Sequence, residues 1–478
     1  MSQQVSEVLD KMRSVLKMTE ISYHQLPQGF SQQENLEQGQ GDTEKQSRPP
    51  PLHWYWCLLP WPLAAALGKT TRRLSKRTPT SYLNGVRGIA CMIIYTQHVN
   101  LHYYKEFIGN PYGADPPENN HGISQIPIIR VMYAGKGMNT AVPDPCVASS
   151  SIISAEDLIT GLCSSILRRG VRLFAPMLVL ACMSCLLTWY YPSFSPGNWR
   201  ENDPTFFQHV WRFVGITLPA FNPFQWDIYA PLSFNQCWTL PVEYRGSIVV
   251  FLMCMATAQL TTRARKIVIL GMAIWALYWV HGDVFAFLTG MFLAELRSCP
   301  LSDDLIFIRK VPQRVTEVLS VCVLLLALML MGWPENGDKG VEPFKAMSLL
   351  IPAGWGATDE MVTFFWSYTT APVALAALEN LPSAQWLLST KPVLYLGEIS
   401  FSFYLLHWMG FLWPGWEMMI RMVNVLHCPM DWSFYLMYFT TLAMLVVSAD
   451  VFWRLIDEKC VSAGKGLAEW LVVHTKHN

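Results

Sequence analysis

The chain has 478 residues, of which 52% are hydrophobic and 15% are charged, and its formal net charge is zero. Soluble domains carry about 25% charged residues, so this composition favours an integral membrane protein. A net charge of zero gives no indication of a nucleic-acid partner, and we expect none. The twelve Cys show no metal-ligand spacing and no small disulfide framework, so we expect buried thiols and no bound metal.

The N-terminal part of the chain is expected to lie outside the membrane. Residues 1–52 are polar and Gln-rich, which predicts a disordered cytosolic tail. Residues 53–78 hold a short apolar segment, which is broken by prolines and suits the membrane interface, and then a run of Lys and Arg. The positive-inside rule places this basic run in the cytosol, just before the first membrane helix.

Residues 79–460 predict an all-α polytopic membrane domain with about nine or ten transmembrane helices. We expect residues 461–478 to form a cytosolic C-terminal tail. We expect the protein to lie in the membrane of the endoplasmic reticulum or in the plasma membrane. The lipid bilayer is therefore its first expected partner. The apolar segments that carry this prediction are 81–104, 173–191, 238–260, 266–282, 284–296, 315–333, 361–380, 393–414 and 433–456.

One crossing is missing from this scheme. The basic clusters at 69–77 and 168–172 should both be cytosolic, so an even number of crossings must separate them. Only one strong apolar helix, 81–104, lies between them, and the residues after Met138 do not form an apolar run. Either a weak membrane helix lies between residues 127 and 167, or a membrane helix is missing there.

The first membrane helix carries the sharpest candidates for chemistry, Arg87 and His98. They are eleven residues apart, so they lie within about 20° of one helix face and roughly 16 Å apart along the axis. Ionisable groups at membrane depth are costly and tend to mark substrate or proton paths. A neutral imidazole can accept a proton from a hydroxyl, so His98 could act as a general base. The alternative is a histidine that packs between helices.

Two further clusters carry charge at helix ends. Arg168, Arg169 and Arg172 could clamp phosphate oxygens, or they could serve only as cytosolic topology signals. Glu243 follows the start of an apolar helix and must be paired, protonated or facing a cavity. Arg245 lies on another face of that helix, so we expect the partner of Glu243 on a different helix.

The last membrane helices hold two more sets of polar residues. Glu398 and His407 are nine residues apart and lie on opposite faces, so they should not pair with each other. His407 could satisfy hydrogen bonds between helices, a common structural use in membranes. Asp450 and Arg454 are four residues apart, which predicts a local ion pair.

Taken in order, these segments resemble the acyltransferase 3 family of polytopic membrane acyltransferases, and in particular its fungal members that modify secondary metabolites. SYLNGVRGIACMIIYTQHV is similar to the family's Arg-x10-His opening, and ILRRGVRLFAPMLV to its Arg-x-x-Arg segment. NQCWTLPVEYRGSIVVF resembles its Trp-Ser/Thr-Leu-x-Val-Glu segment, and LYLGEISFSFYLLHWM its late helix with a histidine. The resemblance covers about residues 79–460. Family members follow the segment that matches residues 135–138 with an apolar helix, so the resemblance implies that a membrane helix has been lost after Met138, through an error in the gene model or a real deletion.

The resemblance implies transfer of an acyl group, commonly acetyl from acetyl-CoA, onto a hydroxyl of a small secondary metabolite of the terpenoid or polyketide kind. Acetyl-CoA would be a co-substrate, and no bound cofactor is expected. The alternatives are a membrane transporter that uses the buried Arg, His and Glu, or an inactive family member. The implied site comprises catalytic His98, Arg87 and Glu243, acyl-CoA-binding Arg168, Arg169 and Arg172, and His407 in support.

Overall fold

The structure is a computed structural model, and it describes residues 78–115, 122–133, 155–191, 203, 205–224, 232–298 and 312–473. The tail predicted over 1–52, nearly all of 53–78 and the stretch 134–154 lie outside these residues. All of the described residues belong to one compact unit, His53–Asn478.

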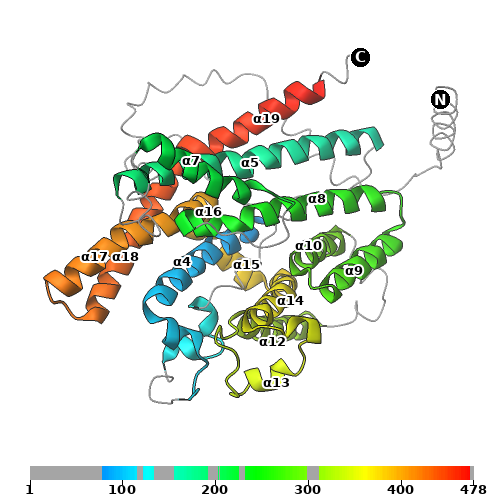
Figure 1. The fold of residues 1–478 in the computed structure, drawn as a ribbon. Coiled ribbons are helices and arrows are strands. Elements are labelled where there is room, and N and C mark those ends of the chain that lie inside the picture. Colours follow the sequence, from blue (N-terminus) through cyan, green and yellow to red (C-terminus); the bar gives the residue numbers. More distant parts are fainter. Residues whose placement is uncertain are drawn as a thin grey trace. The chain divides into compact units, whose positions relative to one another are not determined.

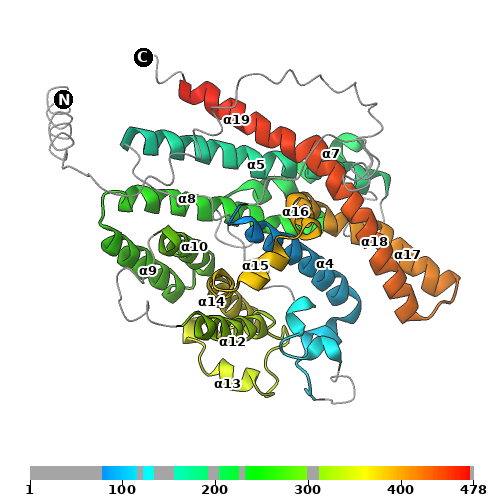
Figure 2. The same ribbon diagram turned by 180° about the vertical axis from the view of Figure 1, so that it is seen from behind.

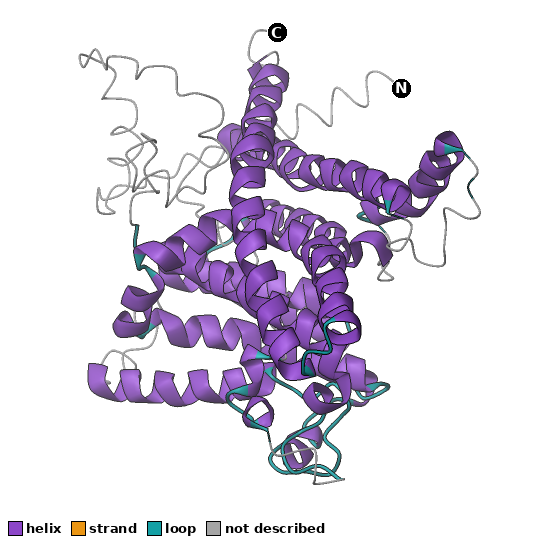
Figure 3. Ribbon diagram, turned by 90° about the vertical axis from the view of Figure 1, so that its left-hand side faces the viewer, coloured by secondary structure: helices purple, strands orange, loops and turns teal. Residues whose placement is uncertain are grey.

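The described part of the chain is built from helices joined by turns and loops, and it contains no strand (Figures 1 and 3). The shorter helices are α7 (Phe206–Thr217), α13 (Phe344–Ser348), α15 (Pro382–Leu388) and α17 (Trp416–Ile420). The long helices are α4 (Ser81–Gly109), α5 (Ala155–Tyr190), α8 (Thr239–Thr257), α9 (Thr262–Tyr278), α10 (Gly282–Ser298), α12 (Gln313–Met331), α14 (Asp359–Glu379), α16 (Lys391–Gly410), α18 (Met430–Phe452) and α19 (Glu458–Val473).

Five helical spans in the described residues are long and apolar enough to cross a membrane, which confirms the predicted all-α polytopic fold. The other four predicted segments also form helices, namely α4, α9, α10 and α16. Helices α9 and α10 have 17 residues each, so they reach about 26 Å, slightly less than the ~30 Å hydrocarbon core. The five spans are Ile159–Tyr190, Asn235–Thr257, Gln313–Met331, Asp359–Glu379 and Met430–Leu471.

Helices α4 and α16 lie side by side and run in the same direction, as the residue pairs along their contact show. Near the start of the contact, the thiol of Cys91 donates to the backbone oxygen of Ser400 at 3.3 Å. Two turns further along both helices, the rings of His98 and His407 lie 5.2 Å apart. Both pairs are separated by 309 residues in sequence, so the two helices keep one register.

Glycines allow the backbones of α4 and α16 to touch. A Cβ atom added at Gly88 would lie 2.6 Å from the backbone nitrogen of Gly397, and one added at Gly397 would overlap the carbonyl oxygen of Asn84. Small residues at a helix interface permit this close approach in membrane proteins. The position of every α4 side chain relative to α16 therefore depends on these glycines.

Helix α5 runs in the same direction as α4 and α16. Arg172 shares a cavity with Arg87 near the start of α4, whereas the hydroxyl of Ser184 lies 3.4 Å from Met409 Sδ, two residues beyond His407 on α16. With 36 residues, α5 is about 54 Å long. It begins well before the predicted residue 173. Its first half packs along α19, which is helical over residues predicted only as a tail (Figures 1 and 2).

The largest apolar core is shared by α4, α5, α16 and α18. Its fully buried members include Tyr95, Met177, Phe403 and Met437. A separate core joins α8, α9 and α10, and others lie between α12 and α14. The candidate site lies where α4, α5 and α16 meet α8, α10 and α14.

A buried arginine ties the far end of α4 to the end of α12. Arg130 is fully buried, and it donates through Nε to the carbonyl of Gly332 and through Nη1 to the carbonyl of Asn110, both at 2.8 Å. Burial lowers the pKa of Arg130 to about 10, although the carboxylate of Glu335 favours the charged form. The residues after α4 are thereby fixed at this end of the bundle.

Candidate active site

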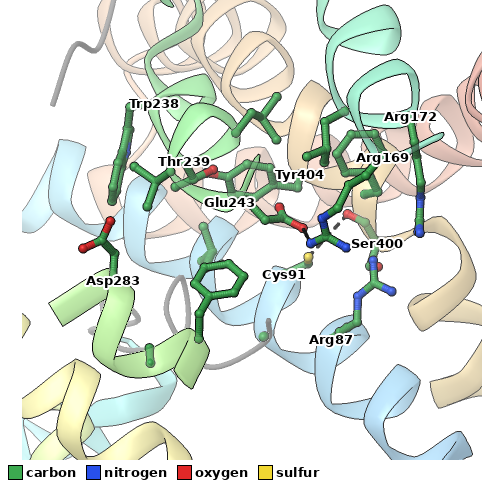
Figure 4. Close-up of a pocket in the computed structure, with 18 of the residues that line it drawn as sticks. Arg87, Cys91, Arg169, Arg172, Trp238, Thr239, Glu243, Asp283, Ser400 and Tyr404 are labelled. Atoms are coloured by element: carbon green, nitrogen blue, oxygen red, sulfur yellow. Dashed lines mark hydrogen bonds and ion pairs between the residues drawn. The ribbon is translucent and has the colours of Figure 1, made fainter. Parts of the chain in front are cut away.

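A cavity of about 140 Å³ opens between α4, α5, α8, α10, α14 and α16 (Figure 4). Four of the seven residues predicted from the sequence line it, and they come from three helices that are far apart in the chain. These four residues are Arg87, Arg169, Arg172 and Glu243.

The three arginines gather at one side of the cavity (Figure 4). Arg169 and Arg172 are three residues apart on α5 and so share a helix face. Arg87 reaches the same place from the start of α4. Guanidinium groups bind phosphate and carboxylate oxygens with two parallel hydrogen bonds, so this side of the cavity suits an anionic ligand.

The expected partner of Glu243 on another helix is Arg169. Their side chains form an ion pair of 2.9 Å between Arg169 Nη2 and Glu243 Oε1, with side chains 11% and 30% exposed. Arg245, two residues on, instead pairs with Asp283 of α10 at 2.6 Å. The prediction that the partner of Glu243 lies on a different helix is therefore confirmed.

A second carboxylate lies near the arginines. Asp457 ends a π-helical turn between α18 and α19, and it is 6% exposed. It is close enough to Arg172 and Arg87 for their charges to interact, and its Oδ1 atom has no hydrogen-bond partner among the described residues. No local pattern around Asp457 indicates that it lies near two helices more than 280 positions earlier in the chain.

The predicted base, His98, does not line the cavity. Its ring stacks on that of His407 at 5.2 Å and 24°, and Trp408 meets it edge-on at 5.2 Å. Tyr404, one turn before His407, does line the cavity. The two histidines thus lie just beyond the cavity, since His407 contacts Tyr404 and stacks on His98.

His407 is held in one orientation by its own helix. Its Nδ1 lies 2.6 Å from the carbonyl oxygen of Tyr404, so Nδ1 carries the hydrogen and donates it. The other ring nitrogen, Nε2, is then an acceptor, and it is buried without a hydrogen-bond partner among the described residues. The structure therefore places His407 next to His98, where a support residue is needed, and away from the three arginines.

The structure places Arg168 outside the predicted phosphate clamp. It is exposed, and its guanidinium donates to the carbonyl of Ser164 and the hydroxyl of Ser165 on its own helix. Successive residues of a helix point about 100° apart, so Arg168 cannot share the face of Arg169. The arginines at the cavity are Arg87, Arg169 and Arg172.

Several lining residues were missed by the sequence reasoning. Cys91 follows Arg87 by one helical turn, and this spacing could have identified it. Asp283 is an acidic residue in the first turn of an apolar helix, the same signal that identified Glu243. Tyr404 carries no such signal, because a tyrosine in an apolar helix is common. Among the described residues, no group of three or more His, Cys, Asp or Glu could hold a metal ion.

The fold and the cavity define a polytopic membrane protein with a buried cationic site. The chain belongs to the acyltransferase 3 family, whose model is described as an acyltransferase domain and matches residues 160–454. The protein is therefore a membrane acyltransferase. It is similar to the O-acetyltransferase PaAT-1 of Phomopsis amygdali, with 24% identity over 380 residues, which cover 69% of this chain and 71% of that protein. No solved structure matches the chain.

Proposed function

We propose that the protein is an O-acetyltransferase that moves the acetyl group of acetyl-CoA to a hydroxyl of a small secondary metabolite. The observation that carries this proposal is the convergence of Arg87, Arg169 and Arg172 on one cavity of an acyltransferase. Coenzyme A is a polyanion with phosphates at one end and a thioester at the other. The arginines would bind its phosphates at the cytosolic mouth.

The size of the cavity sets how the donor would enter. A volume of about 140 Å³ is too small for the nucleotide of coenzyme A, since sites for whole drug-sized ligands measure roughly 300–1,000 Å³. Only the thin pantetheine arm and the acetyl group would pass inward. They would run from the arginines toward Tyr404 and the histidine pair beyond it.

In this proposal His98 is the general base. The acceptor hydroxyl attacks the thioester carbonyl while His98 takes its proton, and the C–S bond then breaks. The coenzyme A thiolate leaves and receives that proton from His98. Because His98 lies outside the cavity lining, a passage between the cavity and His98 would have to open when the substrates bind. His407 would keep the ring of His98 in place by stacking.

The role of His98 is tested by mass spectrometry of metabolites from a host that lacks this gene. Wild type, His98→Ala and the control His427→Ala are added back at equal protein levels, since His427 lies in an exposed turn. We expect one acetyl-bearing product to return with wild type and the control but not with His98→Ala. Full rescue by His98→Ala would refute the assignment of His98 as the general base. Failure of wild type to change any product by an acetyl group would favour a transporter.

The role of the arginines is tested in vitro with neighbouring residues of one helix. A hydrogen bond to a charged group contributes about 1.5–3 kcal/mol, so Arg169→Ala should raise the KM for acetyl-CoA by roughly 10- to 150-fold. Arg168→Ala removes the same charge from the exposed face and should leave KM unchanged. Equal effects of the two variants would show that the charge acts only through topology.

A further inference from the structure

The cavity has a second end with different chemistry. In Figure 4, Asp283 and Trp238 lie on the side opposite to the three arginines. Phe287, Tyr368 and Tyr404 also line the cavity, so aromatic rings make up much of its wall. If the arginines hold the donor, this aromatic end is free for the acceptor.

Two of these rings are held by glycines of neighbouring helices. A Cβ atom added at Gly246 of α8 would overlap the ring of Phe287, and one added at Gly282 of α10 would overlap the ring of Tyr368. Any larger residue at either position would have to displace one of these rings. The aromatic wall is therefore built by close packing and does not need a ligand to form.

The remaining rings are fixed by contacts with one another. Trp238 meets Phe364 edge-on with ring centroids 6.3 Å apart, and Phe364 stacks on Tyr368 at 5.9 Å and 26°. Tyr404 donates to the backbone oxygen of Gln236 at 2.6 Å. Such edge-on and offset contacts are the favoured geometries of aromatic pairs. A ligand would therefore meet flat surfaces that are already in place.

The polar groups at this end are balanced in charge. The carboxylate of Asp283 accepts from Arg245 through Oδ2 at 2.6 Å, so the buried pair is neutral overall. Its Oδ1 remains able to accept a hydrogen bond from a ligand, and the hydroxyls of Thr239 and Tyr404, 2.8 Å apart, lie at the same end. A neutral ligand with a hydroxyl group fits these acceptors, and a charged one does not.

We propose that this end of the cavity binds the acceptor, and that the acceptor is a neutral alcohol with a flat ring. Its ring would pack between Trp238, Phe287 and Tyr368, and Asp283 would accept a hydrogen bond from it. The cavity of about 140 Å³ admits at most one ring of the acceptor, because an apolar cavity of about 150 Å³ binds benzene. The pantetheine arm would need the additional space of the passage that opens toward His98. The inference rests on the proposed function, since it assigns the arginine end to acetyl-CoA.

The test uses the full chain in lipid nanodiscs and three probes with seven carbons, benzyl alcohol, 1-heptanol and toluene. Binding is measured by saturation-transfer NMR, with the signal on empty nanodiscs subtracted. A hydrogen bond to a charged group predicts that benzyl alcohol binds at least about tenfold more tightly than toluene. The flat wall predicts that it also binds more tightly than 1-heptanol. These comparisons need no variant, so misfolding cannot imitate them.

Variants on one helix then locate the site. Phe287→Leu removes an aromatic contact, which should weaken benzyl alcohol binding by about two- to tenfold. Phe292→Leu, on the same helix but outside the cavity lining, should bind as wild type. Equal binding of benzyl alcohol and 1-heptanol, or equal effects of the two variants, would overturn the proposal.

A parallel titration with acetyl-CoA separates the two proposals. Acetyl-CoA binding that depends on Arg169, together with no binding of benzyl alcohol, would overturn the ring site and leave the proposed function standing. Benzyl alcohol binding in a protein that does not bind acetyl-CoA would overturn the proposed function, and with it the acceptor role of this site.

Discussion

The glycine contact between α4 and α16 predicts a large functional effect from adding one methyl group. In Gly88→Ala the new Cβ would lie 2.6 Å from the backbone nitrogen of Gly397, about 0.8 Å short of an ordinary contact. Backbone cannot rotate away as a side chain can, so the helices must separate. Overpacking of this kind costs about 1–3 kcal/mol, and a displacement near 1 Å at reacting groups can lower a rate about 100-fold.

The assay pairs thermal unfolding in detergent with acetyl transfer, and compares Gly88→Ala with Gly271→Ala. Gly271 is also inside a helix, but a Cβ atom there would meet nothing within 4 Å. Alanine at such a site should leave stability unchanged or raise it by about 0.5–1 kcal/mol. We expect Gly88→Ala to unfold at a lower temperature and to lose most of its activity. If the two variants behave alike, the close approach does not position the site.

Two further predictions concern buried charge. Asp450→Asn breaks a buried ion pair with Arg454 (2.5 Å) and should lower the unfolding free energy by about 3–5 kcal/mol. The control Glu417→Gln breaks the exposed pair with Arg421 at the same i, i+4 spacing and should cost less than about 1 kcal/mol. Equal losses of the two variants in chemical unfolding would contradict the role of burial. Arg130→Met removes the donor of the buried carbonyl of Gly332 and leaves the part-buried carbonyl of Asn110 with the 3.5 Å bond from Gln125 Nε2, so it should cost about 1–3 kcal/mol. The loss should appear as a lower unfolding temperature at unchanged helix content, and no shift would show that the carbonyl of Gly332 finds another donor.

The sequence predicts the helices well, because a membrane helix is fixed by the length of its apolar run. Eight of the nine predicted segments either agree with the bounds of the observed helix to within a few residues or overlap that helix over most of its length. The first half of α5 was missed, since it is only mildly amphipathic and is stabilised by packing along α19. Packing between segments far apart in sequence leaves no local pattern to find.

The candidate site was predicted only in part for the same reason. A charged residue in an apolar helix must face a cavity or a partner, which identified Arg87, Arg169, Arg172 and Glu243. The identity of each partner depends on the register between helices, which glycines and ring contacts decide. The separation of His98 from the cavity follows from that register and could not be obtained from helical spacing on α4 alone.

The common direction of α4 and α5 has a consequence for the gene itself. Two successive helices that cross a bilayer in the same direction need a return crossing between them. The described residues after α4 form only single turns, and Arg130 holds them next to Asn110 at the far end of the bundle. The described residues between α4 and α5 thus supply no return crossing, and the sequence of residues 134–154 has no run of ~20 apolar residues.

Helix direction and the distribution of basic residues thus require the same crossing on independent grounds. Sequencing of the mature transcript should reveal about 20 additional apolar codons after Met138 if the loss is an error of splicing assignment. A transcript identical to the printed sequence would instead mean that the loss is real and that the chain lacks the return crossing. A strain that carries this sequence should then lack the acetylated product.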